Sequence, residues 1–333
     1  MNALVTGGGG FLGLALVEQL VHRGDQVRVL CRGDYPRLRE LGVEQVSADI
    51  RDTSRVAAAC QNIDTVFHVA AVSGIWGDWS HYYSINTQGT LNVLHGCQTH
   101  SVQRLVYTSS PSVVYDGRDH IHADESLPYP TRFLCHYPHS KALAEQAVRK
   151  AAADGPLLTV SLRPHLIWGP RDNHLIPRLI ARARAGRLVR VGPGTNRISI
   201  SYVDNAAIAH LQAADALQPG SPLNGQAYFI NDPDPVAMWP WIDELLRRAG
   251  LPPVRRTIPA GLAYAAGWTL ETLHHLLGRS AEPPMTRFLA QQLAGSHHYS
   301  IERARRDFGY APPVDHATGM DRLTPDLVRL ASS

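Results

Sequence analysis

A strand, a glycine-rich turn and a helix follow one another directly at the N-terminus of the chain. The β-branched run NALVT leads through TGGGGFLG into FLGLALVEQLVHRG, whose apolar residues recur at helical spacing before a final glycine. Gly7 permits a tight turn, Gly10 lets the backbone approach a pyrophosphate at the positive end of the helix, and Gly13 lets helix and strand pack closely. The unit predicts a dinucleotide-binding fold; a glycine-rich turn without a ligand is the alternative.

Strands and helices alternate along the first half of the chain. Strand-like runs follow at residues 26–31, 43–49, 64–71, 103–110 and 157–164, with helical runs at 85–100 and 137–153. Such alternation is typical of parallel strands joined by right-handed helical crossovers. We therefore expect an α/β fold, a doubly wound parallel sheet of the Rossmann type over residues 1–170. Beyond it the alternation loosens, and residues 171–333 are expected to form a smaller, partly helical substrate-binding lobe, with some segments returning to the sheet.

Composition and charge exclude several kinds of protein. With 44% hydrophobic residues, 18% charged residues and a net charge of +3, the chain resembles an ordinary globular protein and carries no basic stripe for nucleic acid. The N-terminus lacks a basic signal region, and the apolar run TIPAGLAYAAGWTL is too short to span a bilayer, so no transmembrane span is expected.

Cysteine and histidine spacing argues against a metal site. The four cysteines lie far apart without paired spacing, which indicates a reducing compartment and a cytoplasmic location. The pairs His274–His275 and His297–His298 are adjacent rather than one helical turn apart, and no carboxylate completes a ligand set. We expect no metal.

Tyr137 and Lys141 stand one helical turn apart in FLCHYPHSKALAEQ. Of 32 basic residues only Lys141 and Lys150 are lysine, so a lysine at this position is notable. A phenol has a pKa near 10, and a nearby ammonium and a positively charged nicotinamide favour the phenolate. Ser109 and Ser110, with Thr108 before them, end the strand-like run 103–110, at the sheet edge where ligands bind. Together with Tyr137 and Lys141 they predict a proton-transfer site; an ordinary helix start is the alternative.

The end of the second strand indicates which nicotinamide cofactor is used. In VRVLCRGDYPR, Cys31 occupies the position of the acid that would bind a free ribose 2′-hydroxyl, and Arg32 follows it. A guanidinium binds a phosphate in a bidentate manner, so Arg32, with Arg37 as a second candidate, predicts NADP(H) rather than NAD(H). Two solvated surface arginines are the alternative, and Asp34 lies close enough to leave NAD(H) open.

A series of motifs resembles the extended short-chain dehydrogenases/reductases over nearly the whole chain. In family order these are TGGGGFLG, ADIRD, VFHVAA, NTQGTLNVL, YTSSPSVVYDG, YPHSKALAE, RPHLIWGP and ISYVDNAAIAH. YTSS, YPHSK, AAVSGIWGDW and YSIERARRDFGYAPP are similar to the 3β-hydroxysteroid dehydrogenase branch in particular.

The resemblance implies roles for individual residues. Tyr137 would exchange a proton with the carbonyl oxygen, Lys141 would hold the nicotinamide ribose and lower the tyrosine pKa, and Ser110 would hydrogen-bond the carbonyl. The cofactor would be bound by Gly7, Gly10, Phe11, Leu12, Gly13, Arg32, Asp49, Ile50, Ala70, Ala71, Tyr137, Lys141 and Pro164. Trp76, His165 and Trp168 would line the substrate pocket.

The resemblance also implies a reaction. It is an NADP(H)-dependent interconversion of a ketone and a secondary alcohol on a lipid-like substrate, most specifically reduction of a 2-alkyl-3-oxoalkanoic acid in long-chain olefin biosynthesis. A 3β-hydroxysteroid or carboxysterol dehydrogenase is the alternative, and a non-catalytic NADP-binding regulator is a third. A sugar-nucleotide dehydratase would need an acidic pair after Thr108, which TSSP lacks. A homodimer and membership of a biosynthetic complex are expectations from the family.

One apolar helix is expected in the second lobe. AGLAYAAGWTLETLHHLL brings Leu262, Ala266, Leu270, Leu273 and Leu277 near one helical face. This face could cover an acyl chain, lie on a membrane surface as a peripheral contact, or pack as an ordinary part of the lobe.

Overall fold

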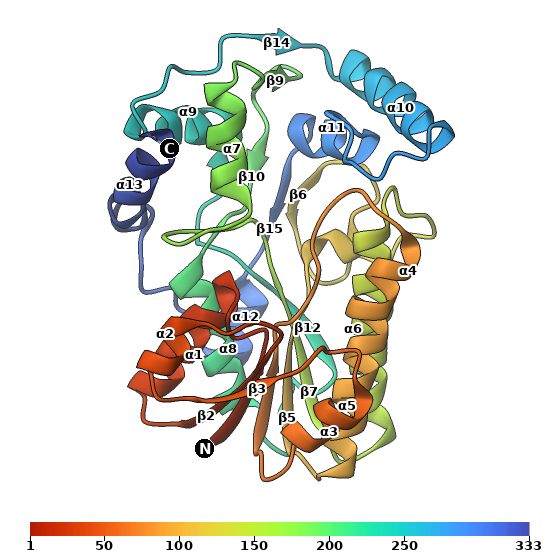
Figure 1. Cartoon of the computed structure of the whole chain (residues 1–333), viewed down its shortest axis with the longest axis vertical. Helices are drawn as coiled ribbons and strands as arrows, with labels where there is room; N and C mark the ends of the chain where they lie inside the picture. Colours follow the sequence, from red (N-terminus) through yellow and green to blue (C-terminus); the bar gives the residue numbers. More distant parts are fainter. Residues whose placement is uncertain (333) are drawn as a thin grey trace.

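The structure, a computed structural model, describes residues 1–332. Its centre is a parallel seven-stranded sheet in the order β12-β7-β5-β4-β1-β2-β3 (Figure 1). The strands are β1 (Asn2–Thr6), β2 (Gln26–Cys31), β3 (Glu44–Ser47), β4 (Thr65–His68), β5 (Arg104–Thr108), β7 (Leu158–Pro164) and β12 (Gln226–Ile230). This order is that of a doubly wound sheet, so the predicted fold class is confirmed.

Helices cover both faces of the sheet. α1 (Phe11–His22), α2 (Pro36–Glu40), α8 (Val203–Ala216) and α12 (Glu302–Phe308) lie on one side in Figure 1. On the other side lie α3 (Thr53–Ala59), α5 (Gly89–Thr99) and α6 (His136–Asp154). The short α4 (Trp79–Tyr82) and a π-helix (Tyr83–Gln88) lead into α5, and a 3₁₀ turn (Pro111–Val114) follows β5.

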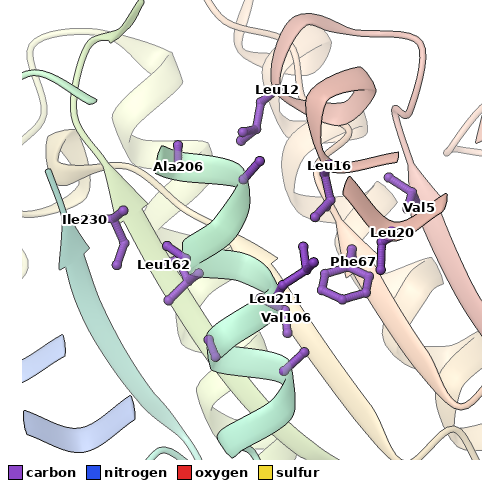
Figure 2. Close-up of a cluster of buried hydrophobic side chains, with 14 of the residues drawn as sticks. Val5, Leu12, Leu16, Leu20, Phe67, Val106, Leu162, Ala206, Leu211 and Ile230 are labelled. Carbon is purple, nitrogen blue, oxygen red and sulfur yellow. The ribbon is translucent and has the colours of Figure 1, made fainter. Parts of the chain in front are cut away.

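Successive residues of a strand point to opposite faces of the sheet, so they pack into two hydrophobic cores, one on each face. Val5 packs into the cluster beneath α1 and α8, whereas its neighbour Leu4 packs beneath α3, α5 and α6. The first cluster joins distant parts of the chain, because it contains Leu12 and Leu16 of α1 together with Ala206 and Leu211 of α8 (Figure 2). The second half of the chain thus completes the hydrophobic core of the central sheet.

The remaining elements form a lobe above the carboxyl ends of the strands (Figure 1). Its helices are α7 (Leu175–Arg184), α9 (Met238–Arg248), α10 (Ala260–Leu276), α11 (Arg287–Ala294) and α13 (His316–Ser332). Its strands are β6 (His120–Ala123), β8 (Ile167–Trp168), β9 (Arg190–Val191), β10 (Arg197–Ile198), β11 (Ser201–Tyr202), β13 (Val236–Ala237), β14 (Thr257–Ile258) and β15 (His297–Tyr299). Within residues 1–332, no helix combines the length and the apolar character needed to cross a membrane.

The lobe is built from both halves of the sequence. β6 precedes residue 170 yet pairs with β15 near the C-terminus, and β8 pairs with β11. In the other direction, β12 pairs with β7 and adds the seventh strand of the central sheet. The sequence predicted that segments would return to the sheet but did not identify β12, since its partner is fixed by tertiary contacts rather than by local pattern.

Candidate active site

A cavity of about 770 Å³ lies at the carboxyl ends of the central strands. Apart from Arg37, every residue predicted for catalysis or cofactor binding contributes to its wall. These residues are Gly7, Gly10, Phe11, Leu12, Gly13, Arg32, Asp49, Ile50, Ala70, Ala71, Ser110, Tyr137, Lys141 and Pro164. Parallel sheets bind ligands in this position, at the crevice where the strand order reverses.

The glycine turn between β1 and α1 fits a pyrophosphate. Gly7 has a φ of +73°, and a Cβ atom there would lie 2.8 Å from the Cα of Ala70. A Cβ on Gly13 would lie 2.2 Å from the carbonyl oxygen of Gly7, so both positions require glycine. No side chain caps the N-terminus of α1 and no acidic residue occupies its first turn. The N–H groups of that turn are therefore suited to an anionic ligand.

Tyr137 and Ser110 are brought together from different elements. Tyr137 is the second residue of α6, and a hydrogen bond joins its side chain to that of Ser110 after β5. The Ser110 hydroxyl lies 2.9 Å from that of Ser112 and accepts the Ser112 N–H at 3.2 Å, which fixes its position. Two hydroxyl groups thus converge at one point of the cavity wall.

Lys141 is buried one turn along α6 from Tyr137. Its Nζ donates to the carbonyl oxygen of Thr108 at 2.6 Å and lies 4.2 Å from the centre of the Tyr107 ring. Burial lowers the pKa of Lys141 to about 7, and the carboxylate of Glu145 acts in the opposite direction. The ammonium is therefore poised between its two protonation states near neutral pH.

The pKa of Tyr137 differs from the expectation. Burial raises the pKa of Tyr137 above its ordinary value, and the hydrogen bond with Ser110 acts against this. Lys141 was expected to lower that pKa, but its ammonium bonds the Thr108 carbonyl and desolvation dominates the pKa of Tyr137. The phenol is thus held protonated, the form that can donate a proton.

Glu145, one helical turn beyond Lys141, forms a buried ion pair with Arg163. The sequence motifs did not predict this pair. Glu145, which is 0% exposed, accepts two hydrogen bonds from Arg163 of β7, at 2.5 and 2.9 Å, and one from Tyr129 at 2.5 Å. Arg163 holds the pKa of Glu145 below its ordinary value despite burial. Glu145 follows Lys141 by four residues, so the spacing of Tyr137, Lys141 and Glu145 on one helical face was a usable signal.

Arg32 marks the end of the cavity where a ribose phosphate would lie. Arg32 is exposed and lies near Asp49. Asp49 pairs with Arg51 at 2.8 Å, and the hydrogen bond between them is the main reason that the pKa of Asp49 is lowered to about 2. Asp34 pairs with Arg39. The second candidate, Arg37, does not line the cavity, because it bonds Glu18 and Glu40.

His165 and Trp168 lie outside the cavity wall, contrary to the prediction. His165 lies 3.0 Å from His297 and 2.6 Å from the Ser199 carbonyl, within the lobe. Trp168 is 0% exposed and donates to Asp232 at 3.3 Å. The neighbouring Pro164, Leu166 and Ile167 line the cavity instead. The backbone turns at Leu166, with a φ of +39°, so the motif RPHLIWGP could not show which side chains face the ligand.

Trp76 also lies outside the cavity wall. Its ring packs against His274 and His275 of α10, with ring centres 5.9 and 4.6 Å apart, and its carbonyl oxygen accepts the hydroxyl of Tyr82. Trp76 therefore joins the loop beyond β4 to the apolar helix of the lobe. Nearby Val72 and Ser73, on the same loop, do line the cavity.

Several cavity residues had no signal in the sequence. Tyr35 covers the glycine turn so closely that a Cβ on Gly9 would lie 2.2 Å from its ring. His81, Asn173 and His174 reach the cavity from loops and a short helix that no local motif marks. Among residues 1–332 no cluster of three potential metal ligands occurs.

Comparisons with known proteins identify the family. Residues 4–259 match the model of the 3-beta hydroxysteroid dehydrogenase/isomerase family. The chain is 48% identical to the 2-alkyl-3-oxoalkanoate reductase of Stenotrophomonas maltophilia, over 97% of this chain and 98% of the relative. It is 45% identical to the protein of the same name from Shewanella oneidensis, over 98% of this chain and 86% of the relative.

More distant relatives retain the length and the fold. A 3-beta-hydroxysteroid dehydrogenase of Mycolicibacterium neoaurum is 37% identical over 97% of this chain and 90% of its own. A solved structure of Thermus thermophilus UDP-glucose 4-epimerase in complex with NAD superposes with a TM-score of 0.74 at 24% identity, covering 99% of both chains. The chain belongs to the 3-beta hydroxysteroid dehydrogenase/isomerase family and is an oxidoreductase.

Proposed function

We propose that the protein is an NADP(H)-dependent reductase that converts a 2-alkyl-3-oxoalkanoic acid to the corresponding 3-hydroxy acid. The observation that carries the chemistry is the hydrogen-bonded pair of Tyr137 and Ser110 beside Lys141, in the same cavity as the glycine turn. The substrate class is supported by full-length similarity to two proteins named 2-alkyl-3-oxoalkanoate reductase.

The chain's own residues account for the proton and the orientation of the substrate. A bound NADPH would supply the hydride for C3 of the substrate. The hydroxyl groups of Tyr137 and Ser110 both donate hydrogen bonds to the 3-oxo oxygen, and the Tyr137 proton passes to that oxygen as the C–H bond forms. Because burial raises the pKa of Tyr137, the phenol remains protonated until the oxygen becomes more basic than a ketone.

Lys141 lies one helical turn from Tyr137, where its ammonium would favour the tyrosinate that remains after proton transfer. Its pKa of about 7 lets the ammonium form or dissociate near neutral pH, and Glu145 favours the charged form. The carbonyl of Thr108 keeps the ammonium directed between β5 and α6.

The preference for NADP(H) rests on Arg32. It lines the cavity, and Cys31 stands before it where a carboxylate would favour NAD(H). The nearby acids Asp34 and Asp49 are each paired with another arginine, so neither competes strongly for Arg32.

A 3β-hydroxysteroid dehydrogenase is the second candidate, since relatives of that name are 37% identical to this chain. A regulator without turnover is less well supported, because Tyr137, Ser110 and Lys141 are all present in the cavity.

We also propose that the protein is a cytoplasmic homodimer that works within a biosynthetic complex. The family resemblance supports the assembly, and four unpaired cysteines are consistent with a reducing compartment.

The test measures nicotinamide absorbance with purified protein and a panel of substrates. NADPH should be consumed with long-chain 2-alkyl-3-oxo acids, and more slowly with NADH. A 3β-hydroxysteroid should give little reduction of NADP⁺. Steroid oxidation without reduction of any 3-oxo acid would reject the proposed substrate in favour of the second candidate.

A further inference from the structure

The helix α10 presents its apolar side to solvent rather than to the protein. Its buried residues are Ala263, Gly267, Glu271 and His274, which recur every three or four positions. Its exposed side carries Leu262, Trp268, Leu273, Leu276 and Leu277, with 60, 56, 47, 78 and 60% exposure. A helix that only packed against the lobe would bury its leucines and expose its charges. The helix thus has the opposite arrangement.

The exposed side of α10 carries no Asp, Glu, Lys or Arg side chain, and its threonine hydroxyls are hydrogen-bonded within the helix. Glu271, the one carboxylate of this helix, points inward, where it pairs with Arg287 at 2.6 Å. Thr269 and Thr272 donate their hydroxyl hydrogens to the carbonyl oxygens of Ala265 and Trp268. Side-chain hydroxyls that bond their own helix can enter an apolar medium without losing a partner.

The helix is held firmly in this orientation. A Cβ atom on Gly267 would lie 2.6 Å from the backbone of Thr286, so α10 approaches the start of α11 closely. Glu271 also accepts the backbone N–H of Arg287 at 2.7 Å. Rotating α10 to bury its leucines would break these contacts and expose a buried ion pair. The apolar side is therefore a fixed surface.

Arginines stand at both ends of this apolar surface. Arg255 and Arg256 precede α10 and Arg279 follows it; all three are exposed. Within the described chain none of the three takes part in an ion pair. Cations at both ends, with a tryptophan and leucines between, match a lipid surface with anionic headgroups. We propose that α10 docks the protein on an anionic lipid surface, with its axis in the plane of the interface.

A second copy of this chain fits the surface less well. An α-helix of 17 residues is about 25 Å long and about 10 Å wide, so one face offers on the order of 250 Å². A stable interface buries about 800 Å² on each partner. Two copies meeting through α10 would also bring arginines of like charge together at the helix ends. A bilayer needs no such complementarity.

The position of α10 links the lipid surface to the active-site cavity. Trp76 packs against the last turn of α10, and the loop that carries it continues from Val72 and Ser73 in the cavity wall. The docking surface does not depend on the reaction proposed above, because it is argued from α10 alone. Its test uses vesicles and requires no turnover.

Flotation of the full-length protein with vesicles tests the proposal. The protein should float with vesicles that contain phosphatidylglycerol and much less with phosphatidylcholine alone, and added salt should weaken binding. The double variant Leu262→Glu, Leu276→Glu should reduce vesicle binding at least about tenfold. Ile121→Glu, Val328→Glu is the matched control, because these side chains are 67 and 49% exposed outside α10. Equal thermal melting of the variants by circular dichroism would show that they fold.

Tryptophan fluorescence supplies a second readout, with a variant that changes neither the charge nor the apolar character of α10. Anionic vesicles should shift the emission of the wild type to shorter wavelength, and Trp268→Phe should remove most of this shift while vesicle binding persists. Failure of the wild type to bind anionic vesicles would overturn the proposal, as would undiminished flotation of the α10 double variant. Conversion of a dimer to a monomer by that variant, without vesicle binding by the wild type, would identify the surface as a protein interface instead.

Discussion

The buried ammonium of Lys141 makes a quantitative prediction about stability. Burial lowers its pKa from 10.5 to about 7, so the folded protein binds this proton less tightly than the unfolded chain does. Between about pH 7 and pH 10.5 the unfolded state holds this proton more often, so the contribution of Lys141 to the free energy of unfolding should rise with pH over this range. Below pH 7 the full cost of the buried charge is present, about 5 kcal/mol.

The variant Lys141→Met removes the charge and keeps an unbranched apolar side chain. At pH 7 the free energy of unfolding of this variant should exceed that of the wild type. The difference is reduced by the contribution of the hydrogen bond to Thr108, which the variant lacks. The advantage should shrink by about 2 kcal/mol between pH 7 and pH 9, as the wild-type lysine loses its proton in the folded state. This change with pH is the quantity to compare, because groups that titrate equally in both proteins cancel.

Urea unfolding of both proteins at pH 7, 8 and 9 gives the difference directly. Lysine-selective isotope labelling gives an independent value, since the chain holds only Lys141 and Lys150. Lys150, with a side chain 77% exposed, provides the solvent-exposed reference, and Lys150→Arg assigns the two signals. A stability difference that stays constant from pH 7 to pH 9, together with a Lys141 signal that titrates near 10.5, would refute the assignment of this lysine as a desolvated ammonium.

Three further predictions follow from the cavity and the ion pair behind it. Tyr137→Phe should lower kcat by about 10² to 10⁴ while leaving the dissociation constant for NADPH within about twofold, measured by single-turnover kinetics and nucleotide fluorescence. Arg32→Ala should reduce the ratio of kcat/KM for NADPH to that for NADH by roughly 10 to 100 fold, and Arg37→Ala, the matched control outside the cavity, should not. Glu145→Gln should lower the free energy of unfolding by about 3–5 kcal/mol by leaving Arg163 buried without its partner, and Glu145→Gln with Arg163→Met should recover part of that loss.

The parts of the site that follow from local sequence were predictable. The glycine turn, Ser110 and the pair Tyr137 and Lys141 each belong to a motif whose geometry is fixed by one strand end or one helical turn. Because parallel strands end at the same edge of the sheet, these motifs had to meet at one cavity. That these residues line one cavity therefore followed from the sequence without knowledge of the lobe.

The remaining features depend on long-range packing. His81 and His174 reach the cavity through loops whose path is set by tertiary contacts, and Trp168 turns into the core on a strand of two residues. The direction of α10 is a further example. Its pattern of leucines predicted an apolar face, but which side meets the protein is decided by the ion pair of Glu271 with Arg287, on the next helix.

Isotope transfer tests the central claim most directly. Purified protein is incubated with a long-chain 2-alkyl-3-oxo acid and NADPH deuterated at C4 of the transferred side, and the product is analysed by mass spectrometry. The account predicts a 3-hydroxy acid with one deuterium at C3, formed by the wild type and at a greatly reduced rate by Tyr137→Phe. Product without deuterium at C3, or equal rates for the two proteins, would contradict hydride transfer with Tyr137 as the proton donor.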